Sequence, residues 1–520
     1  MTSPPETPRF PSKAISSSME SLRRLLLEKE EIINDKEITI GRHSEVIQSQ
    51  KARIAFLEEQ LHLQKIKQFS ASSEKNPHQL SLFNEAEEIE EQQVEPEPED
   101  KSKKKKPSGR KGLNPDIPRV QQRIELSEVE KYGAIETYFV KVKEELDIIP
   151  AQVQVIEIMQ EKAVFLSEAK ERKLLSASLP KHPLPKAVAS TNTLAYVIVA
   201  KYMDALPLYR LENILSRYGG SVTRTTLANW LIRLAEPLTP LINLIREHQW
   251  EGTLIQADET RIQVLKEPER SVTSDKWMWV TRGGPPGQPS VLFEYDPSRS
   301  QEIPLRLLEG FSGCLQTDGY AGYNAVAQKQ KLVHAGCWDH ARRKFDEADK
   351  VARTQNKTAK GKSKSGTPSK ARIALSKINK LYLIEREIKD QSPAEKVRLR
   401  QERSLPHLNE FKAWLEKNQT KVLKGSLTSK AIYYTLNQWG KLICYCEHGE
   451  IPISNILAEN AIRPFCIGRR NWLFSDTPKG AHASALYYSL VETAKANGLE
   501  PYEYFRVILK QLPYADTVEK

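Results

Sequence analysis

Three acidic residues stand where carboxylates can gather, and their type suits metal-dependent chemistry at phosphorus. Asp258, in IQADET, and Asp318, in LQTDGY, each end an apolar run that predicts a strand. Glu459, in NILAENAIRP, lies on a predicted helix. Carboxylate oxygens are the hard ligands that Mg²⁺ or Mn²⁺ prefers. Two such ions about 3.5–4 Å apart activate an attacking oxygen and stabilise a leaving one, so the trio predicts in-line displacement without a covalent enzyme intermediate.

Each acid also has a purely structural interpretation, and spacing alone leaves both open. Asp258 could cap a strand end, Asp318 could belong to an ordinary turn, and Glu459 could be a surface helix residue. Glu259 directly follows Asp258 and therefore points to the opposite face of the strand. We expect Glu259 to be the poorer metal ligand.

The elements that must position the acids follow an informative order. Between residues 250 and 352, hydrophobic patterns predict three strands, a helix, a strand, a helix, a strand and a helix. This is the order of the ribonuclease-H-like fold, which mixes antiparallel and parallel strands under flanking helices. The first and fourth strands are neighbours in that fold, so Asp258 and Asp318 would converge, and the helix of Glu459 would reach the same corner.

The predicted fold class is therefore α/β multidomain, with a ribonuclease-H-like catalytic core and a helical insertion. Residues 353–370 are rich in Lys, Ser and Gly and are expected to be disordered. The predicted segments are a coiled-coil helix at 14–69, a charged linker at 70–118, a small module at 119–180, a helical DNA-binding region at 185–248, the first part of the catalytic domain at 250–352, a disordered loop and helical insertion at 353–446, and the last part of the catalytic domain with C-terminal helices at 447–513.

The N-terminal helix carries a seven-residue apolar repeat. Its members are Leu26, Ile33, Ile40, Ile47, Ile54 and Leu61. This period lays one apolar seam along a helix and favours a left-handed coiled coil. The second heptad position is poor, being occupied by Lys29, Lys36, His43, Gln50 and Leu57. The seam predicts self-association, and packing on the rest of the protein is the alternative.

Charge is distributed unevenly along the chain. Residues 85–100 hold nine acids and no base, and residues 101–112 hold seven bases and no acid. Such blocks repel themselves and stay solvated, so the basic block could grip phosphates as a flexible arm or act only as a tether. The formal net charge of +11 and the pI of about 9.1 favour a polyanionic partner, nucleic acid being the commonest.

Composition predicts a cytoplasmic globular protein. The chain has 520 residues, 39% hydrophobic and 28% charged, which is enough for several cores. We expect neither a membrane span, because no run of eighteen apolar residues occurs, nor a secretory signal. The five cysteines are scattered without a CxxC pair, so disulfides and zinc are not expected. Cys337 with His334 offers two ligands without partners and is a poor metal site.

A helix pair before the catalytic region has the pattern of a helix-turn-helix. LPLYRLENILSRYGG ends at a glycine pair, and SVTRTTLANWLIRLAEPL starts a second helix with Ser221 or Thr223 as N-cap and Pro237 as its stop. The start of the second helix contacts DNA in such motifs. The residues expected to face DNA are Arg224, Thr225, Thr226 and Asn229. An ordinary helical bundle is the alternative.

Two further basic motifs are candidates for DNA contacts. The first, CWDHARRKF, contains His340, Arg342 and Arg343. It follows the fifth predicted strand, where such side chains could touch phosphate or could lie on an ordinary surface helix. The second, RRNWLF, sets Arg469 and Arg470 beside Trp472. Trp472 could stack on an unpaired base or belong to the core.

Several long motifs together resemble the transposases of the insertion-sequence 66 family. In chain order they are FSASSEK, LSLFNEAE, LPLYRLENILSRYGGSVTRTTLANW, ADET, QTDGYAGY, CWDHARRKF, AENAIRPFCIGRRNWLF and SLVETAKANGLEPYEY. They cover most of the chain. The resemblance implies a DDE transposase in which Asp258, Asp318 and Glu459 are the catalytic acids and hold two Mg²⁺ or Mn²⁺ ions. It also implies double-stranded DNA, as transposon ends and target, and small companion proteins as partners.

The chain departs from the family pattern at two places. The family usually carries a Cys-rich zinc module, and the matching stretch, residues 132–165, keeps Pro150 and Ala151 but has no cysteine. We expect a degenerate, zinc-free module there. The family usually has Arg directly after the catalytic Glu, whereas this chain has Asn460. The nearby cation for phosphate would then be Arg463, Arg469 or Arg470.

The expected activity is DNA transposition, in which water nicks the transposon end and the freed 3′-hydroxyl attacks the target. A homodimer or higher oligomer, associated with the nucleoid, is expected because two ends must be brought together. The alternatives are a decayed DNA-binding remnant, for which the lost cysteines and Asn460 speak, a structure-selective ribonuclease-H-like nuclease, and a coiled-coil repressor acting through residues 1–250.

Overall fold

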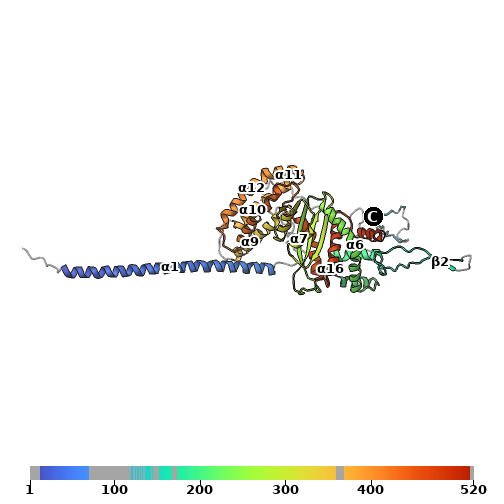
Figure 1. The fold of residues 1–520 in the computed structure, drawn as a ribbon, viewed down its shortest axis with the longest axis horizontal. Coiled ribbons are helices and arrows are strands. Elements are labelled where there is room, and N and C mark those ends of the chain that lie inside the picture. The colour runs from blue at the N-terminus through green and yellow to red at the C-terminus, as the bar shows by residue number, and fades with distance from the viewer. Residues whose placement is uncertain are drawn as a thin grey trace, which may run out of the picture.

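A long helix leads into an α/β body with a group of helices beside its sheet (Figure 1). The computed structural model describes residues 12–69, scattered positions between 119 and 151, and residues 152–166, 172–358 and 368–515. The predicted linker at 70–118, with its acidic and basic blocks, lies outside the described residues.

A five-stranded mixed sheet forms the centre of the body. Its strands are β3 (Leu254–Ile262), β4 (Lys276–Gly283), β5 (Ser290–Asp296), β6 (Cys314–Gln316) and β7 (Val333–Ala335). Their order in the sheet is β5-β4-β3-β6-β7. β3, β4 and β5 pair antiparallel, whereas β3, β6 and β7 pair parallel. β3 is therefore the central strand, and β6 joins it from a separate part of the chain.

Helices alternate with the later strands in the predicted order, and the last of them follows β7. They are α7 (Glu302–Leu307), α8 (Gly322–Lys329) and α9 (Trp338–Thr358). Parallel strands need such crossovers because a tight hairpin can only reverse the chain direction. The turn after β6 contains Gly319 at φ 96°, which glycine adopts without steric strain. A Cβ at Gly319 would lie 3.2 Å from Gln438 Cδ, so this turn packs closely on the helical insertion.

The two faces of the sheet are buried under different helices. The helices over the first face are α6 (Arg224–Trp250), α15 (Ile456–Trp472) and α16 (Pro478–Ala496). Phe293 lies in the core on that face, and Trp279 lies in the core formed with α7 and α8 on the other. Side chains alternate between faces along β3, so Asp258 shares the α15 face and Glu259 shares the α7–α8 face.

A helical insertion between α9 and α15 has a core of its own. Its elements are α10 (Lys370–Glu387), α11 (Pro393–Leu399), a π-helical turn (Arg400–Ser404), α12 (Leu405–Gln419), α13 (Leu427–Asn437), α14 (Trp439–Ile443) and a 3₁₀ turn (Cys444–Cys446). Trp338 of α9 packs between Phe411, at 6.2 Å, and Trp439, at 6.0 Å. The insertion therefore rests on the helix that follows the last strand of the sheet.

The predicted disorder from residue 353 is wrong for its first part, because α9 continues to Thr358. Asp349 supports this end of the helix by pairing with Arg353 at 2.7 Å, one turn later, and by accepting a hydrogen bond from Ser369 Oγ at 2.8 Å. Composition alone did not reveal these contacts. Residues 359–367 lie outside the described residues.

Between Thr191 and the start of the five-stranded sheet lie α4 (Thr191–Tyr202), α5 (Leu208–Arg217) and α6. Thr223 caps α6, as expected, and its Oγ1 accepts a hydrogen bond from Thr226 N at 3.3 Å. The prediction that Pro237 stops this helix is wrong, because α6 passes through it and ends at Trp250. The proline removes one backbone hydrogen bond, and the burial of Leu234 and Leu238 on either side of it holds the helix together.

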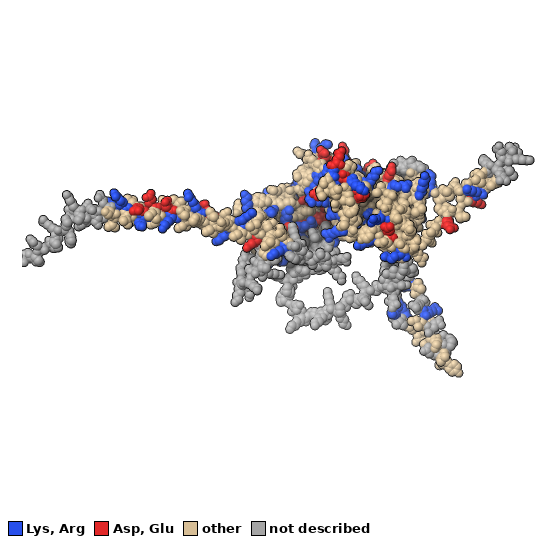
Figure 2. Space-filling model, turned by 90° about the horizontal axis from the view of Figure 1, so that it is seen from below, with Lys and Arg blue, Asp and Glu red and all other residues tan. Residues whose placement is uncertain are grey.

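α1 (Ser12–Phe69) is a rod of 58 residues with both signs of charge along it (Figure 2). Its last turns pack on the insertion, where Glu59 Oε2 accepts a hydrogen bond from Leu427 N at 3.0 Å and Leu63 joins the core. Further toward the N-terminus the apolar seam is exposed, Ile40 by 67% and Ile47 by 50%. The seam is also exposed near the end of the helix, Ile54 by 56% and Leu61 by 51%, so the packing of the last turns does not cover it and the coiled coil stays a prediction.

The predicted module at 119–180 is described in part. It contains an antiparallel hairpin of β1 (Lys162–Leu166) and β2 (Arg172–Ser176). At the other end of the chain, α17 (Pro501–Gln511) packs on α4, and a 3₁₀ turn (Leu512–Tyr514) follows it. Within the described ranges, no helix is both long enough and apolar enough to cross a membrane.

Candidate active site

The pairing of β3 with β6 brings Asp258 and Asp318 onto neighbouring strands of the sheet. The two strands run parallel, with Gln256 opposite Gln316. Asp258 and Asp318 each come two residues later, so the two acids lie at the same level of neighbouring strands. The prediction that Asp258 ends its strand is wrong, because β3 continues to Ile262, whereas Asp318 follows the end of β6. The carboxylates are locally fixed, because each Oδ1 accepts a backbone hydrogen bond of 2.8 Å from a residue that follows it.

Two buried glutamines hold together the segments that carry the acids. Gln256 Nε2 donates to Gln316 Oε1 at 2.8 Å and to Ser454 O at 3.2 Å. Gln256 Oε1 accepts from Ala458 N, in the first turn of α15, at 3.2 Å. Gln316 Nε2 donates to Pro452 O at 2.7 Å. This glutamine pair therefore ties both strands to the start of the helix that bears Glu459.

Sequence reasoning missed Gln256 and Gln316, although a signal for them is present. IQADET and LQTDGY share a glutamine two residues before the acid. Side chains two apart on a strand lie on the same face, so the repeated spacing could have predicted a polar partner beside each carboxylate.

α15 delivers Glu459 to the same corner. Its side chain is 3% exposed and forms an ion pair with Arg343 of α9. His340 Nδ1, also from α9, lies 3.5 Å from Glu459 Oε1. The cation that faces Glu459 is therefore Arg343. That Arg463, Arg469 or Arg470 supplies a cation for phosphate stays a prediction. Sequence reasoning named Arg343 but could not place it against an acid 116 residues away.

The acids interact electrostatically across this corner. Burial raises the pKa of Asp258 well above its ordinary value, and the neighbouring charges of Asp318 and Glu459 are among those that raise it further. Burial also raises the pKa of Glu459 to about 7, against the effect of Arg343. Because each ionised acid makes the next one harder to ionise, a cation placed among them would be strongly favoured.

The donor set at this corner fits hard divalent cations. Carboxylate oxygens are the preferred ligands of Mg²⁺ and Mn²⁺. Glu459 Oε1 is buried and has no hydrogen-bond partner among the described residues, so a lone pair is left for a ligand. A buried charged oxygen without a partner is costly, which is the condition that a bound cation relieves.

Glu259 faces away from this corner, as its place on β3 predicts. Its side chain is 1% exposed and pairs with Arg299, whose Nε donates at 2.9 Å. Tyr323 Oη donates to Glu259 Oε2 at 2.8 Å. The guanidinium of Arg299 lies 4.5 Å from the ring centre of Trp277 and 4.0 Å from that of Tyr320. With both oxygens occupied on the far face, Glu259 supports the fold beside the acids.

The basic residues of CWDHARRKF differ in exposure. Arg342 is 2% exposed and lies in the interior of α9's packed face, so we exclude it from the residues that contact DNA. His340 and Arg343 both turn toward Glu459. Burial, with Arg343 adding to it, lowers the pKa of His340 to about 4, so the imidazole is neutral near pH 7.

The basic residues of α15 lie along β3 beyond Glu459. Arg469 NH1 donates to Thr260 Oγ1 at 3.1 Å, and Thr260 shares the strand face of Asp258. Arg463 is half-buried and Arg470 is exposed. Arg470 is therefore accessible to DNA, whereas Arg469 has a hydrogen-bond partner within the protein.

Trp472 is held by the protein core. Its ring packs edge-on against Phe465 at 5.6 Å, and Lys201 Nζ lies 5.6 Å from its ring centre. This packing favours the core interpretation of the aromatic residue over base stacking. At the start of α6, Arg224, Thr225 and Asn229 are exposed and Thr226 is half-buried; their contact with DNA stays a prediction.

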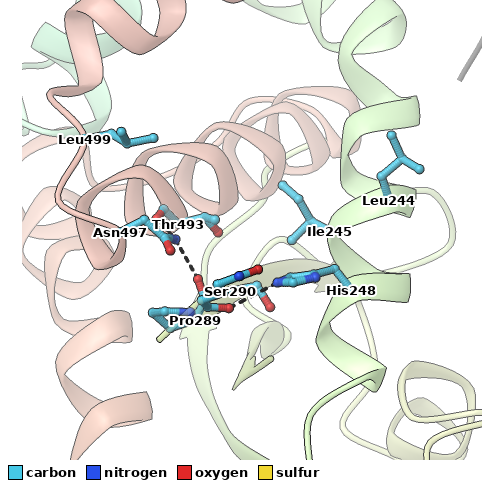
Figure 3. Close-up of a pocket in the computed structure, with 9 residues that line it drawn as sticks. Leu244, Ile245, His248, Pro289, Ser290, Thr493, Asn497 and Leu499 are labelled. Carbon is cyan, nitrogen blue, oxygen red and sulfur yellow. Dashed lines mark hydrogen bonds between the residues drawn. The ribbon is translucent and has the colours of Figure 1, made fainter. Parts of the chain in front are cut away.

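An open groove of about 490 Å³ lies at a different place on the sheet. It is bordered by α6, the start of β5 and α16 (Figure 3). Asn497 Nδ2 donates to Pro289 O at 2.8 Å in its wall. Ser290, at the base of the groove, pairs with Gly283, which is the last residue of β4. The groove has no carboxylates along it and is separate from the candidate active site.

Comparison with known proteins defines the class to which this fold and corner belong. Residues 186–483 match the family model described as Transposase IS66 family. Residues 56–121 match a model described as Transposase C of IS166 homeodomain, and residues 489–520 match the IS66 C-terminal element. The class is thus a transposase. The chain belongs to the IS66 transposase family, as its motifs predict.

The relatives extend this family assignment without adding a mechanism. Uncharacterized protein y4qI of Sinorhizobium fredii is 30% identical over 421 residues, which cover 78% of this chain and 75% of that protein. Uncharacterized protein y4jD of the same bacterium is 30% identical over 398 residues, which cover 74% of each. Their names state no activity, so the chemistry has to be argued from the residues.

Proposed function

We propose that this protein is a DDE transposase that nicks DNA at transposon ends and joins the freed 3′ end to target DNA. Asp258, Asp318 and Glu459 are its catalytic acids. The observation that carries the proposal is their convergence: two neighbouring parallel strands and the first turn of α15 bring them to one partly buried, electrostatically coupled corner. The strand order β5-β4-β3-β6-β7 supports a ribonuclease-H-like core.

The three carboxylates would hold two Mg²⁺ or Mn²⁺ ions. When bound, such a pair activates the attacking oxygen and stabilises the leaving one. The chain's own part is to fix the ligands. Gln256 and Gln316 set the spacing of the strands against α15, and contacts behind the ligands of this kind commonly matter to metal sites by about 10–100-fold.

Arg343 has two consecutive tasks in this proposal. Without ions it neutralises buried Glu459. Once cations take over that neutralisation, its guanidinium is placed to donate to a phosphate of the scissile strand, a geometry for which arginine is well suited. Arg470 and the exposed start of α6, with Arg224 and Asn229, would hold the flanking duplex.

The exposed seam of α1 supports a dimer, because two transposon ends have to meet. Its apolar residues recur at heptad spacing, and they are exposed at Ile47 and on both sides of it along the helix. A second copy of α1 would cover them by coiled-coil packing. A shared coiled coil would then join the two catalytic domains. Each domain would pack against the last turns of its own α1.

Cleavage and joining of a labelled transposon-end duplex in Mg²⁺ or Mn²⁺ tests the proposal. Wild type should nick and join, and Asp258→Asn, Asp318→Asn and Glu459→Gln should each lose at least about 10²–10³-fold in rate. Asp275→Asn is the matched control, because this exposed acid directly precedes β4 and forms an ion pair with exposed Arg261 at 3.2 Å.

The other outcomes separate the alternatives. Nicking of branched DNA without joining would point to a structure-selective nuclease. Specific binding of the end without any cleavage, even with a cell extract supplying companion proteins, would point to a decayed remnant. Activity that survives all three acid substitutions would overturn the catalytic assignment.

A further inference from the structure

Three side chains of different chemistry meet on the α9 side of Glu459. The sulfur of Cys337, a ring nitrogen of His340 and a carboxylate oxygen of Glu459 all lie within 4.8 Å of one another. Cys337 is 1% exposed and Glu459 is 2% exposed. His334, which the sequence analysis considered together with Cys337 as a poor metal site, is not part of this cluster. Its Nε2 lies 3.0 Å from Thr317 Oγ1.

Two helix starts build this cluster. Cys337 directly precedes α9 and His340 lies in its first turn, so the two side chains are three residues apart and share a face. Glu459 lies in the first turn of α15. The positive ends of both helices favour anionic groups at these positions, whereas burial raises the pKa of the Cys337 thiol well above its ordinary value.

The cluster leaves polar atoms without partners. His340 Nδ1 and Glu459 Oε1 are buried, 3.5 Å apart, and neither has a hydrogen-bond partner within the described part of the chain. Cys337 Sγ accepts a hydrogen bond from Asn455 N at 3.4 Å, a contact of the kind that supports metal-bound thiolates. Asn455 is itself fully buried, and both of its amide atoms likewise have no partner among those residues.

We propose that Cys337, His340 and Glu459 form a second metal site, selective for Zn²⁺, and that its occupation switches off the proposed catalytic corner. Sulfur and imidazole ligands select Zn²⁺ over Mg²⁺, which prefers oxygen. Tetrahedral Zn²⁺ sets such ligand atoms about 3.3–3.7 Å apart, so a small contraction of the cluster completes the site. Binding releases the Cys337 thiol proton to solvent, and water takes the fourth position.

Inhibition follows from the sharing of Glu459. Its Oε2 pairs with Arg343 and its Oε1 is the oxygen that faces His340. Zn²⁺ on Oε1 would draw the carboxylate toward α9 and deprive the Mg²⁺ ions of one of their three acids. Zn²⁺ binding is independent of the proposed function, whereas its inhibitory effect rests on it.

Cobalt absorption tests the site without DNA. Metal-free full-length protein is titrated with Co²⁺, which reports thiolate ligation through charge-transfer absorption. Wild type should bind one thiolate-ligated Co²⁺ per chain and release it to Zn²⁺. Cys337→Ser should abolish this absorption, and His340→Gln should weaken Co²⁺ binding about tenfold or more. Cys444→Ser is the matched control, because that thiol lies outside the cluster, and it should behave as wild type.

A second arm measures inhibition of DNA nicking in Mg²⁺. Zn²⁺ should inhibit wild type, and Cys337→Ser should need about tenfold more Zn²⁺ for the same inhibition. If wild type does not nick DNA at all, the proposed function fails while the cobalt result still decides on the site.

Absence of thiolate absorption in wild type, or its survival in Cys337→Ser, would overturn the site. If Cys337→Ser does not fold, X-ray absorption of wild type with one Zn²⁺ replaces it. One sulfur at about 2.3 Å with nitrogen or oxygen at about 2.0–2.1 Å, the nitrogen being lost in His340→Gln, would support the site. A zinc shell without sulfur would contradict it.

Discussion

Gln256 Nε2 donates a hydrogen bond of 2.8 Å to Gln316 Oε1. Gln256 lies two residues before Asp258, and Gln316 lies two residues before Asp318. The same Gln256 accepts from Ala458 N, next to Glu459. One amide pair thus spans all three segments that carry the proposed catalytic acids. Their relative positions depend on a contact that touches none of the carboxylates.

Gln256→Ala should therefore raise the Mn²⁺ concentration needed for half-maximal DNA nicking by about 10–100-fold. The strands and α15 would remain, but the ligands would no longer be held at one spacing. Added Mn²⁺ should restore part of the rate. Nicking is measured as a function of Mn²⁺ concentration in both proteins.

Gln249→Ala is the matched control for this substitution. Gln249 is also buried, at 1% exposure, and its Nε2 bonds Thr281 O at 3.3 Å toward the other end of the sheet. Each substitution leaves buried polar groups unpaired and should cost about 1–3 kcal/mol of stability. Equal shifts in metal dependence for both variants would show that Gln256 acts only through stability.

The raised pKa of Glu459 predicts a pH dependence of the metal-free protein. Its pKa is about 7 in the folded state against an ordinary value of 4.5, so between these values the folded chain keeps a proton that the unfolded chain has lost. Stability should fall as pH rises through this window. Thermal melting with a chelator across the window measures it, and Glu459→Gln should flatten the slope.

Glu416→Gln, at an exposed position of α12, should leave that slope as in wild type. In the presence of Mn²⁺, ion binding must displace the proton from Glu459. The apparent Mn²⁺ affinity should therefore weaken as pH falls below about 7. An affinity that is constant across this range would mean that Glu459 is not a ligand.

Arg343→Ala should destabilise the metal-free protein at pH 8 by about 1–2 kcal/mol. The partner Glu459 is buried, but the side chain of Arg343 is 26% exposed, so solvent screening reduces the loss. Arg353→Ala, on the same helix but 56% exposed, should cost less than about 1 kcal/mol. Urea unfolding measures both.

A double-mutant cycle identifies the partner of Arg343. In a Glu459→Gln background the destabilisation by Arg343→Ala should largely disappear, because no charge is left to compensate. An undiminished loss in that background would place the contribution of Arg343 elsewhere.

The seam of α1 predicts that Ile47→Asp converts a dimer into a monomer, since each chain would bury a carboxylate in the coiled coil. Ser49→Asp, at a nearby exposed position off the seam, should remain dimeric. Sedimentation equilibrium distinguishes the two. A wild type that is monomeric at every concentration, or a dimeric Ile47→Asp variant, would rule out the seam as the dimer interface.

The sequence predicted the element order because the signals were local. Turn residues set the end of β6 and so placed Asp318 directly after a strand, whereas Asp258, predicted at a strand end, lies within β3. Glu459 was a candidate from its residue type, and the family resemblance supported it as the third acid, because no local rule relates residues so far apart along the chain.

What the sequence could not supply depends on long-range packing. Pro237 was predicted to end its helix because local sequence rules do not account for the burial of Leu234 and Leu238. Arg342 read as a DNA contact because a charged residue is rarely buried. The pairing of Arg343 with Glu459 joins two helices that only the folded chain brings together.

Metal ligation by Asp258 is the central claim, and Asp258→Cys tests it most directly. Thiolate is a soft ligand that Mg²⁺ accepts poorly and Mn²⁺ accepts better. Wild type should nick the transposon end in either metal, whereas Asp258→Cys should be inactive in Mg²⁺ and recover measurable nicking in Mn²⁺. If Asp258→Cys nicks equally well in both metals, or remains inactive in both while it still folds and binds the end, the claim is contradicted.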